Sequence, residues 1–247
     1  MSIHTADAIV LRLYPYRETS AFVSCLTDRF GKVKGMIKGL RDRSRPRYRS
    51  AMEPMTWNRI VFYDTRSSPI HLITQCDLLN GFDGLARDLE SIRVAATCIE
   101  LTDVVVEPDE PQPQIFELLK ATLQRLSSGD TRLGSIRIHF VLRLLKLAGF
   151  HPQLDACAHC NRGLIGHAAS WSSKQGGLLC DDCLHEDPRA ERMGSELIDV
   201  LAACAATDEP LEVASPTAIV LLPRLHEFLH WRLDRPLRTL RAPVAVP

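Results

Sequence analysis

A chain of 247 residues with 45% hydrophobic and 24% charged side chains has an ordinary globular composition, long enough for two or three small domains. No apolar run approaches the roughly 18 residues of a membrane span and no signal segment opens the chain, so we expect a cytoplasmic protein with no membrane partner. The formal net charge is zero, yet residues 1–80 carry 13 basic and 7 acidic side chains, which indicates an anionic partner for this part.

Short strands are predicted for residues 4–80. Apolar or alternating runs occur at 8–14, 21–27, 57–63 and 70–74, and a basic strand starting at Lys32 follows a turn-like segment at 28–31. Five strands without helical periodicity predict a small antiparallel barrel, and the five-stranded OB-type barrel matches that count. We therefore expect an OB-fold nucleic-acid-binding domain over residues 1–80, because a basic groove on this barrel commonly binds single strands.

The segment 29–49 holds nine Lys or Arg and one acid, a local charge of +8. Its first part suits a strand with a wet basic face, and its second part is too polar to bury and predicts an exposed loop. Such a charge density attracts phosphate backbones, which these cations would contact without reading bases. The predicted DNA-binding residues are Lys32, Lys34, Lys38, Arg41, Arg43, Arg45, Arg47 and Arg49.

Two alternatives accompany this segment. It could be a merely solvated loop, although its charge exceeds what solubility requires. Phe30 and Tyr48 could stack on exposed bases, or either could be a core residue.

From Phe82 onward the spacing of apolar residues becomes helical. Apolar positions recur at helical intervals over 85–104, 115–126, 136–148, 196–206 and 221–233, and Pro or Gly stands near several of the ends. This pattern predicts an α-helical domain over residues 81–247.

Two Cys-x2-Cys pairs interrupt the helices: Cys157 and Cys160, then, after 19 residues, Cys180 and Cys183. Each pair can turn two thiolates toward one ion, and four sulfurs complete a closed tetrahedral shell, so we predict one structural Zn²⁺ in an insertion at 154–187. Four ordinary thiols are the alternative, and His159 or His167 could substitute as a ligand. The expected fold class is thus α+β and multidomain: an OB-type barrel, then an α-helical domain with a four-cysteine zinc-finger insertion.

The remaining cysteines fall on apolar faces and are expected to be inert core residues; they are Cys25, Cys76, Cys98 and Cys204.

A second pattern, His226-Glu227-x-x-His230, matches the zinc metalloprotease motif, in which two His hold zinc and the Glu is the general base. Only 17 residues follow it, with no His, no Cys and one acid, so a third ligand is hard to find there. The same helix can pack through its apolar residues. A zinc metalloprotease stays an alternative, but no other catalytic constellation occurs, and we expect a protein that is not an enzyme.

Several motifs occur in an order known from one family. The first group is Tyr16-Arg-Glu-Thr-Ser20, followed by 23–27 and Gly31-Lys32. The second is Lys38-Gly-Leu-Arg41, followed by 43–45 and Glu53-Pro-Met55. The third is the two cysteine pairs within a helical domain, and the last is Arg235-Pro-Leu-Arg-Thr-Leu-Arg241. In this order they resemble the bacterial RecO family over essentially the whole chain. Each N-terminal motif is loose by itself, and the order carries the resemblance.

The resemblance implies a sequence-independent DNA-binding, strand-annealing recombination mediator in DNA repair. It implies single- and double-stranded DNA as ligands, RecR and the acidic C-terminal tail of single-strand-binding protein as partners, and RecA as the protein loaded through them. It implies nucleoid association within the cytoplasm, and zinc, because the four cysteines are kept here. The His-Glu-x-x-His pattern is no part of it. A protein-interaction module whose basic loop binds acidic tails is the remaining alternative.

Overall fold

The structure is a computed structural model that describes residues 2–40, 52–64, 68–164, 167–233 and 237–239. It divides into two compact units, Met1–Thr131 and Arg132–Pro247, which are described separately. The described helices include none with the length and apolarity that crossing a bilayer requires.

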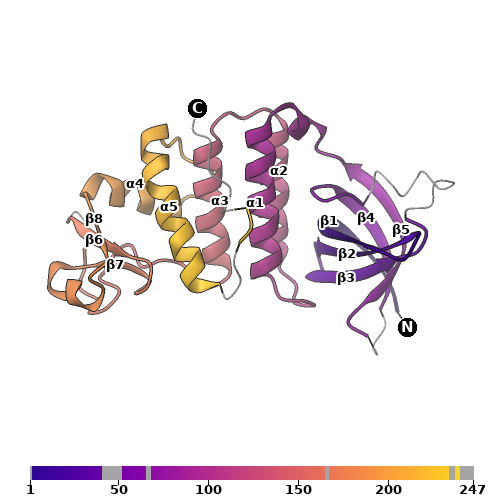
Figure 1. Ribbon diagram of the computed structural model, residues 1–247, viewed down its shortest axis with the longest axis horizontal. Coiled ribbons are helices and arrows are strands. Elements are labelled where there is room, and N and C mark those ends of the chain that lie inside the picture. The colour runs from indigo at the N-terminus through magenta and orange to yellow at the C-terminus, as the bar shows by residue number, and fades with distance from the viewer. Residues whose placement is uncertain (1, 41–51, 65–67, 165–166, 234–236, 240–247) are drawn as a thin grey trace. The chain divides into compact units, whose positions relative to one another are not determined.

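The first unit begins with a closed five-stranded barrel (Figure 1). Its strands are β1 (Ser2–Tyr16), β2 (Ser20–Thr27), β3 (Lys32–Ile37), β4 (Trp57–Asp64) and β5 (His71–Asn80). They follow the order β1-β2-β3-β5-β4, and every pair is antiparallel except β3–β5. The predicted OB-type barrel is confirmed.

The barrel interior is filled from all five strands. Inward side chains include Val10, Val23, Val33, Phe62 and Ile73, each at most 2% exposed. The register of β1 shifts between Val10 and Arg12, where a bulge interrupts its pairing with β2. A bulge adds one residue to a strand and thereby changes which residues face inward.

Three helical elements complete the first unit: η2 (Asp83–Arg87), α1 (Leu89–Val105) and α2 (Pro113–Ser127). The predicted first helix began at Leu85, whereas α1 begins at Leu89, because Asp88 caps it by accepting hydrogen bonds from the backbone N–H groups of Glu90 and Ser91. Hydrogen bonds from Ser91 lower the pKa of Asp88, as expected for a carboxylate at a helix N-terminus.

The connection between α1 and α2 lies against the start of β3. Asp109 donates its backbone N–H to the carbonyl of Lys32, and Glu110 lies directly over Gly31. A Cβ atom at Gly31 would overlap the carbonyl oxygen of Glu110, and its φ of +65° is left-handed. Glycine is therefore required at this turn by both space and conformation.

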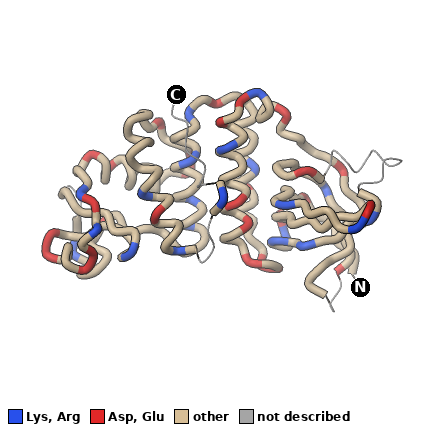
Figure 2. The backbone as a smooth tube through the Cα atoms, in the orientation of Figure 1, with Lys and Arg blue, Asp and Glu red and all other residues tan. Residues whose placement is uncertain are grey.

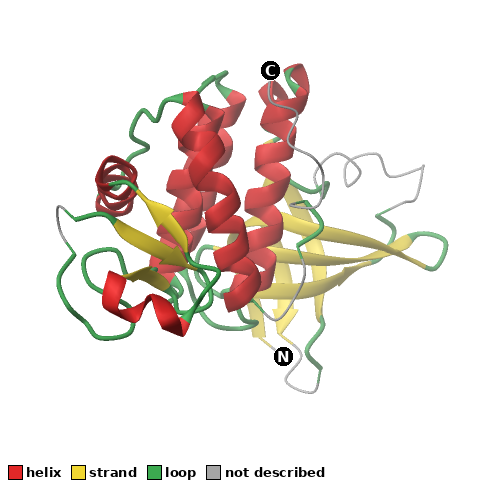
Figure 3. Cartoon of the chain, turned by 60° about the vertical axis from the view of Figure 1, so that its left-hand side comes forward, coloured by secondary structure: helices red, strands yellow, loops and turns green. Residues whose placement is uncertain are grey.

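The second unit contains three long helices and a small sheet (Figure 3). The elements are α3 (Leu133–Leu147), β6 (Ala169–Ser172), β7 (Gly177–Leu179), η3 (Asp181–Glu186), β8 (Glu191–Met193), α4 (Ser195–Ala206) and α5 (Ser215–Arg232). The sheet has the order β7-β6-β8. Trp171 of β6 meets Phe228 of α5 with ring centroids 5.7 Å apart, so the sheet packs on that helix.

The predicted helical domain after the barrel and its cysteine-rich insertion are confirmed. The barrel ends at Asn80, but α1 and α2 share a compact unit with it, whereas the predicted division placed them in a domain over 81–247. The domain boundaries stay a prediction.

Candidate nucleic-acid interface and metal centre

Lys32 does not have the exposed position predicted for it. Its side chain is 9% exposed, and its ammonium group donates to the carbonyl oxygen of Asp103 at 2.6 Å and lies 3.9 Å from that residue's Oδ1. A buried ammonium held this way cannot also reach a phosphate in solvent. For Lys32 the prediction of a DNA contact is therefore corrected to a structural role.

Asp103, on α1, is the centre of this arrangement and was missed by sequence reasoning. Its carboxylate accepts a hydrogen bond from the hydroxyl of Ser24 at 3.1 Å and pairs with Nε of Arg12 at 2.5 Å. One side chain thus joins α1 to β1, β2 and β3. Its only sequence signal was an acid on a helix, which does not distinguish it from solvated acids.

Lys34 and Lys38 are exposed, at the middle and just beyond the end of β3. The other predicted contacts, Arg41, Arg43, Arg45, Arg47 and Arg49, lie outside the described residues, as does Tyr48. Phe30 is partly buried and packs against the barrel core: its ring centroid lies 5.4 Å from that of Phe62 and 4.7 Å from that of His4. These contacts favour the core alternative for Phe30 over stacking on bases.

The four paired cysteines meet at one point in the second unit. Sγ of Cys157, Cys160, Cys180 and Cys183 all lie within 4.8 Å of one another, and Sγ of Cys160 is 3.7 Å from Sγ of Cys180. Four sulfurs placed about 2.3 Å from a central ion would be separated by about 3.8 Å along the edges of a tetrahedron. The spacing thus fits a tetrahedral metal ion.

Local backbone hydrogen bonds form the two turns. Asn161 donates to the carbonyl of Cys157 at 2.9 Å, and Cys183 donates to the carbonyl of Cys180 at 3.1 Å. Asn161 adopts φ of +61°, a left-handed conformation that Asn tolerates better than most residues. These tight turns explain why a spacing of two residues places both sulfurs on the same side.

The surroundings favour a thiolate at Cys157. Burial opposes its ionisation, but backbone N–H groups of Cys160, Cys180 and His159 point at the sulfur and lower the pKa of Cys157 to about 6. Thiolates are the form that binds metal.

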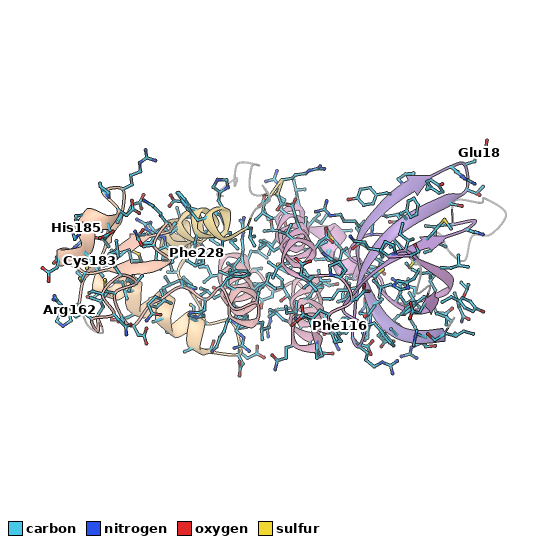
Figure 4. The ribbon with its side chains drawn as sticks, turned by 90° about the horizontal axis from the view of Figure 1, so that it is seen from below. Glu18, Phe116, Arg162, Cys183, His185 and Phe228 are labelled. Atoms are coloured by element: carbon cyan, nitrogen blue, oxygen red, sulfur yellow. The ribbon has the colours of Figure 1, made fainter. Side chains whose placement is uncertain are left out.

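Acidic residues lie close to the cysteines in the chain. Figure 2 shows acidic positions gathered along the segment of η3. Arg162, which projects outward in Figure 4, pairs with one of these acids, Asp182, at 2.6 Å.

Histidine does not replace any of these ligands. His159 Nε2 lies 3.5 Å from a carboxylate oxygen of Glu186, and His167 is exposed. Among the described residues, the four cysteines form the only group of three or more side chains arranged to hold a metal. The other four cysteines are buried, as expected.

The His226-Glu227-x-x-His230 pattern lies on α5, where its residues have other surroundings. Glu227 accepts a hydrogen bond from the hydroxyl of Ser173 at 3.0 Å, and Ser173 accepts one from Nε1 of Trp171 at 2.9 Å. Burial, with a contribution from the charge of Arg137, lowers the pKa of His226 to about 3. The motif's glutamate thus anchors α5 to the small sheet, and the geometry does not support the peptidase alternative.

We expect Glu227→Ala to lower the free energy of unfolding by about 1 kcal/mol at most, because it removes the acceptor of the buried Ser173 hydroxyl, although Glu227 itself is exposed. Glu227→Gln keeps an acceptor and should recover most of that loss. Urea unfolding monitored by Trp fluorescence measures both. Asp199→Ala, an exposed acid on α4, is the control and should be near neutral. An unchanged stability in Glu227→Ala would contradict the anchoring role.

Comparisons with known proteins agree along the whole chain. Sequence models described as "Recombination protein O N terminal" and "Recombination protein O C terminal" match residues 1–82 and 86–241. A "DNA repair protein RecO" of Anaeromyxobacter sp. (strain K) is 32% identical over 239 residues, covering 94% of this chain and 92% of that protein. Proteins of the same description from Geobacter metallireducens and Nocardioides sp. are 32% and 30% identical, covering 81% and 96% of this chain and 80% and 98% of their own lengths.

Proposed function

Because the chain belongs to the RecO family of DNA repair proteins, we propose that it is a recombination mediator that binds DNA without reading its sequence and anneals complementary strands. The family is not a known family of enzymes, and we propose that this member turns over no substrate. The observation that carries the proposal is the closed OB-type barrel, whose exposed Lys34 and Lys38 lead directly into the arginine-rich segment 41–49.

The DNA contacts in this proposal are Lys34, Lys38 and the five arginines of segment 41–49. Lys32 is left out because it is buried against Asp103. Ammonium and guanidinium groups bind phosphate oxygens in any sequence, which suits a protein that must act wherever DNA is damaged. Annealing then needs no chemistry by the protein: neutralising two backbones reduces their repulsion, and base pairing supplies the free energy.

We further propose that the protein acts with RecR and single-strand-binding protein, through the latter's acidic tail, in loading RecA, and that it works at the nucleoid in the cytoplasm. Family membership supports these partners. The basic segment is compatible with an acidic tail as well as with DNA.

The metal in this proposal is one Zn²⁺ held by Cys157, Cys160, Cys180 and Cys183. Bound there, zinc would cross-link two turns and supply no open position for water, so its contribution would be structural. DNA binding and annealing are carried by the chain's own cations.

A salt series tests the proposal. Binding of a fluorescent single-stranded oligonucleotide should weaken with a slope of log affinity against log salt of roughly −3.5 if about five phosphates are engaged. A variant with Arg41, Arg43, Arg45 and Arg47 changed to Ala should approach a slope of about −0.7, because each lost contact removes about 0.7.

The matched control removes four exposed cations elsewhere: Arg87, Arg93, Lys146 and Lys174 to Ala. It makes the same change in net charge and should keep the wild-type slope. If the two variants show equal slopes, the site does not lie on the basic segment. If wild type binds no better than a neutral protein at low salt, the mediator proposal fails, and an acidic peptide becomes the ligand to test.

A further inference from the structure

The barrel has an outer row of apolar and aromatic side chains that lies apart in sequence from the arginine-rich segment 41–49. Past the bulge in β1, Leu13 packs on the barrel core, so its neighbours Tyr14 and Arg12 face outward. Tyr14 pairs directly with Phe22 of β2, and Phe22 pairs with Met36 of β3. Directly paired residues lie on the same face of a sheet. An apolar and aromatic row thus crosses the outside of β1, β2 and β3.

Further along the same face, α1 covers part of the barrel. In the neighbouring row, Arg12 and Ser24 contact Asp103, whereas Lys34, which pairs with Ser24, is exposed. In the row after that, Lys32 contacts Asp103 and its partner Leu26 is fully buried. Among the residues that the structure describes, nothing comparable covers the row of Tyr14, Phe22 and Met36: Tyr14 is 50% exposed and the other two are partly exposed. The cover by α1 thus ends within the row of Arg12 and Ser24, before the aromatic residues.

The aromatic rings are held in defined positions. The rings of Tyr16 and Phe22 have centroids 4.5 Å apart, and the guanidinium of Arg17 lies 5.2 Å from the centroid of Tyr16. Arg12 donates to the hydroxyl of Tyr14 at 3.2 Å. Cross-strand packing alone explains the Tyr16–Phe22 pair. It does not explain Tyr14, whose ring is fixed at its hydroxyl while half of its surface remains in water.

Cations border this row. Lys34 and Lys38 are exposed and alternate with Met36 along the chain, and Arg17 is exposed at the turn between β1 and β2. The one acid at that turn, Glu18, extends away from the barrel (Figure 4). Flat apolar rings with cations beside them match a ligand that has flat apolar groups on an anionic backbone. Single-stranded nucleic acid has both, whereas a duplex keeps its bases stacked inside.

We propose that Tyr14, Tyr16 and Phe22 form a platform on which unpaired bases stack, so that the protein holds single strands more tightly than duplex DNA. This inference rests on the proposed DNA-binding function and adds the bases as a second ligand group beside the phosphates. Stacking is tolerant of sequence because every base has a flat face, so the platform is compatible with binding that does not read sequence. The cations on the same barrel contact both forms of DNA, whereas the platform contacts only strands whose bases are free.

The test measures Tyr14→Ala and Tyr16→Ala against a single-stranded oligonucleotide, the same oligonucleotide with abasic positions, and a duplex of equal length. Each variant should bind the single strand roughly tenfold more weakly than wild type, with an unchanged salt slope. Duplex affinity should not change. Wild type should lose affinity on the abasic strand, and the variants should bind that strand as wild type does, because neither has a stacking contact left to lose.

Two further variants are compared with these. Tyr14→Phe keeps the ring but loses the hydroxyl to which Arg12 donates, so it should recover most of the single-strand affinity that Tyr14→Ala loses. Trp231→Ala is the control: it removes an aromatic side chain that is 53% exposed in the other unit and should change nothing. Circular dichroism establishes that each variant folds. The inference is overturned if Tyr14→Ala weakens single-strand and duplex binding equally, or if wild type binds abasic and normal strands equally. If wild type binds no DNA at all, the proposed function itself fails, which is a distinguishable result.

Discussion

Replacing Cys183 by Ser is expected to abolish metal binding and to lower the free energy of unfolding of the second unit by about 3–5 kcal/mol. Three thiolates without the fourth hold zinc weakly, and the turns at 157–160 and 180–183 would lose the ion proposed to join them. In this variant the helices α3, α4 and α5 keep their apolar contacts. The decrease in the free energy of unfolding is therefore expected to be smaller than the roughly 10–16 kcal/mol that zinc contributes to isolated finger peptides.

The loss should spread beyond the cysteines. Ser172 of β6 donates its hydroxyl to Asp187 at 2.5 Å, and Gln175 donates to the carbonyl of Glu186 at 3.3 Å. Both acceptors follow Cys183 closely in the chain, so they move when its turn opens. β6 in turn packs on α5 through Trp171, whose fluorescence should therefore report the change.

Metal analysis of protein purified without chelator measures the zinc content of each variant, and thermal unfolding measures its stability. Wild type should carry about one zinc per chain, and the variant close to none. Cys204→Ala is the control: Cys204 is buried on α4, away from the cluster, so that variant should keep its metal and lose only about 1 kcal/mol. A wild-type protein that carries no metal and unfolds at the same temperature as Cys183→Ser would overturn the assignment of the centre.

Replacing Asp103 by Ala is expected to lower the free energy of unfolding of the first unit by about 3 kcal/mol. The change leaves the buried ammonium of Lys32 without its carboxylate and removes the acceptors of Arg12 and Ser24. Removing one partner of a buried ion pair costs more than the pair itself contributes, because the other charge stays out of water. The backbone carbonyl of residue 103 still accepts a hydrogen bond from Lys32 in this variant. The expected loss of stability is therefore at the lower end of the roughly 3–5 kcal/mol that removing one partner of a buried ion pair usually costs.

Thermal unfolding should show the effect as a decrease in Tm of about 10 °C. Asp7→Ala is the matched control: Asp7 pairs with Arg59 at 2.8 Å, but that arginine is 55% exposed, so the loss of this pair should leave the Tm nearly unchanged. The double variant Asp103→Leu with Lys32→Met replaces the pair by apolar groups and should recover much of the stability. A near-neutral Asp103→Ala, or a double variant no better than the single, would contradict the structural role of this pair.

The local sequence was sufficient to predict the strands, the helices and the cluster of four cysteines. Strand alternation, helical spacing and Cys-x2-Cys turns depend on residues a few positions apart, and their outcomes agree with the predicted barrel, helices and cysteine cluster. The predicted start of the first helix, Leu85, lies about one turn before the observed start of α1. Asp88 caps the N-terminus of α1, so the helix begins after it, although the apolar spacing extends back to Leu85. The spacing of apolar residues does not identify a capping residue.

Only the tertiary structure decided which side chains face which environment. Lys32 and Lys34 read alike in the sequence, yet Asp103, 71 residues after Lys32, buries the first and leaves the second in water. Glu227 gained a structural partner in Ser173, 54 residues earlier. Because of the bulge in β1 between Val10 and Arg12, Tyr14 faces outward and pairs with Phe22 of β2. Element type is determined by neighbours along the chain, whereas the role of a side chain depends on contacts made across it, which the sequence order does not contain.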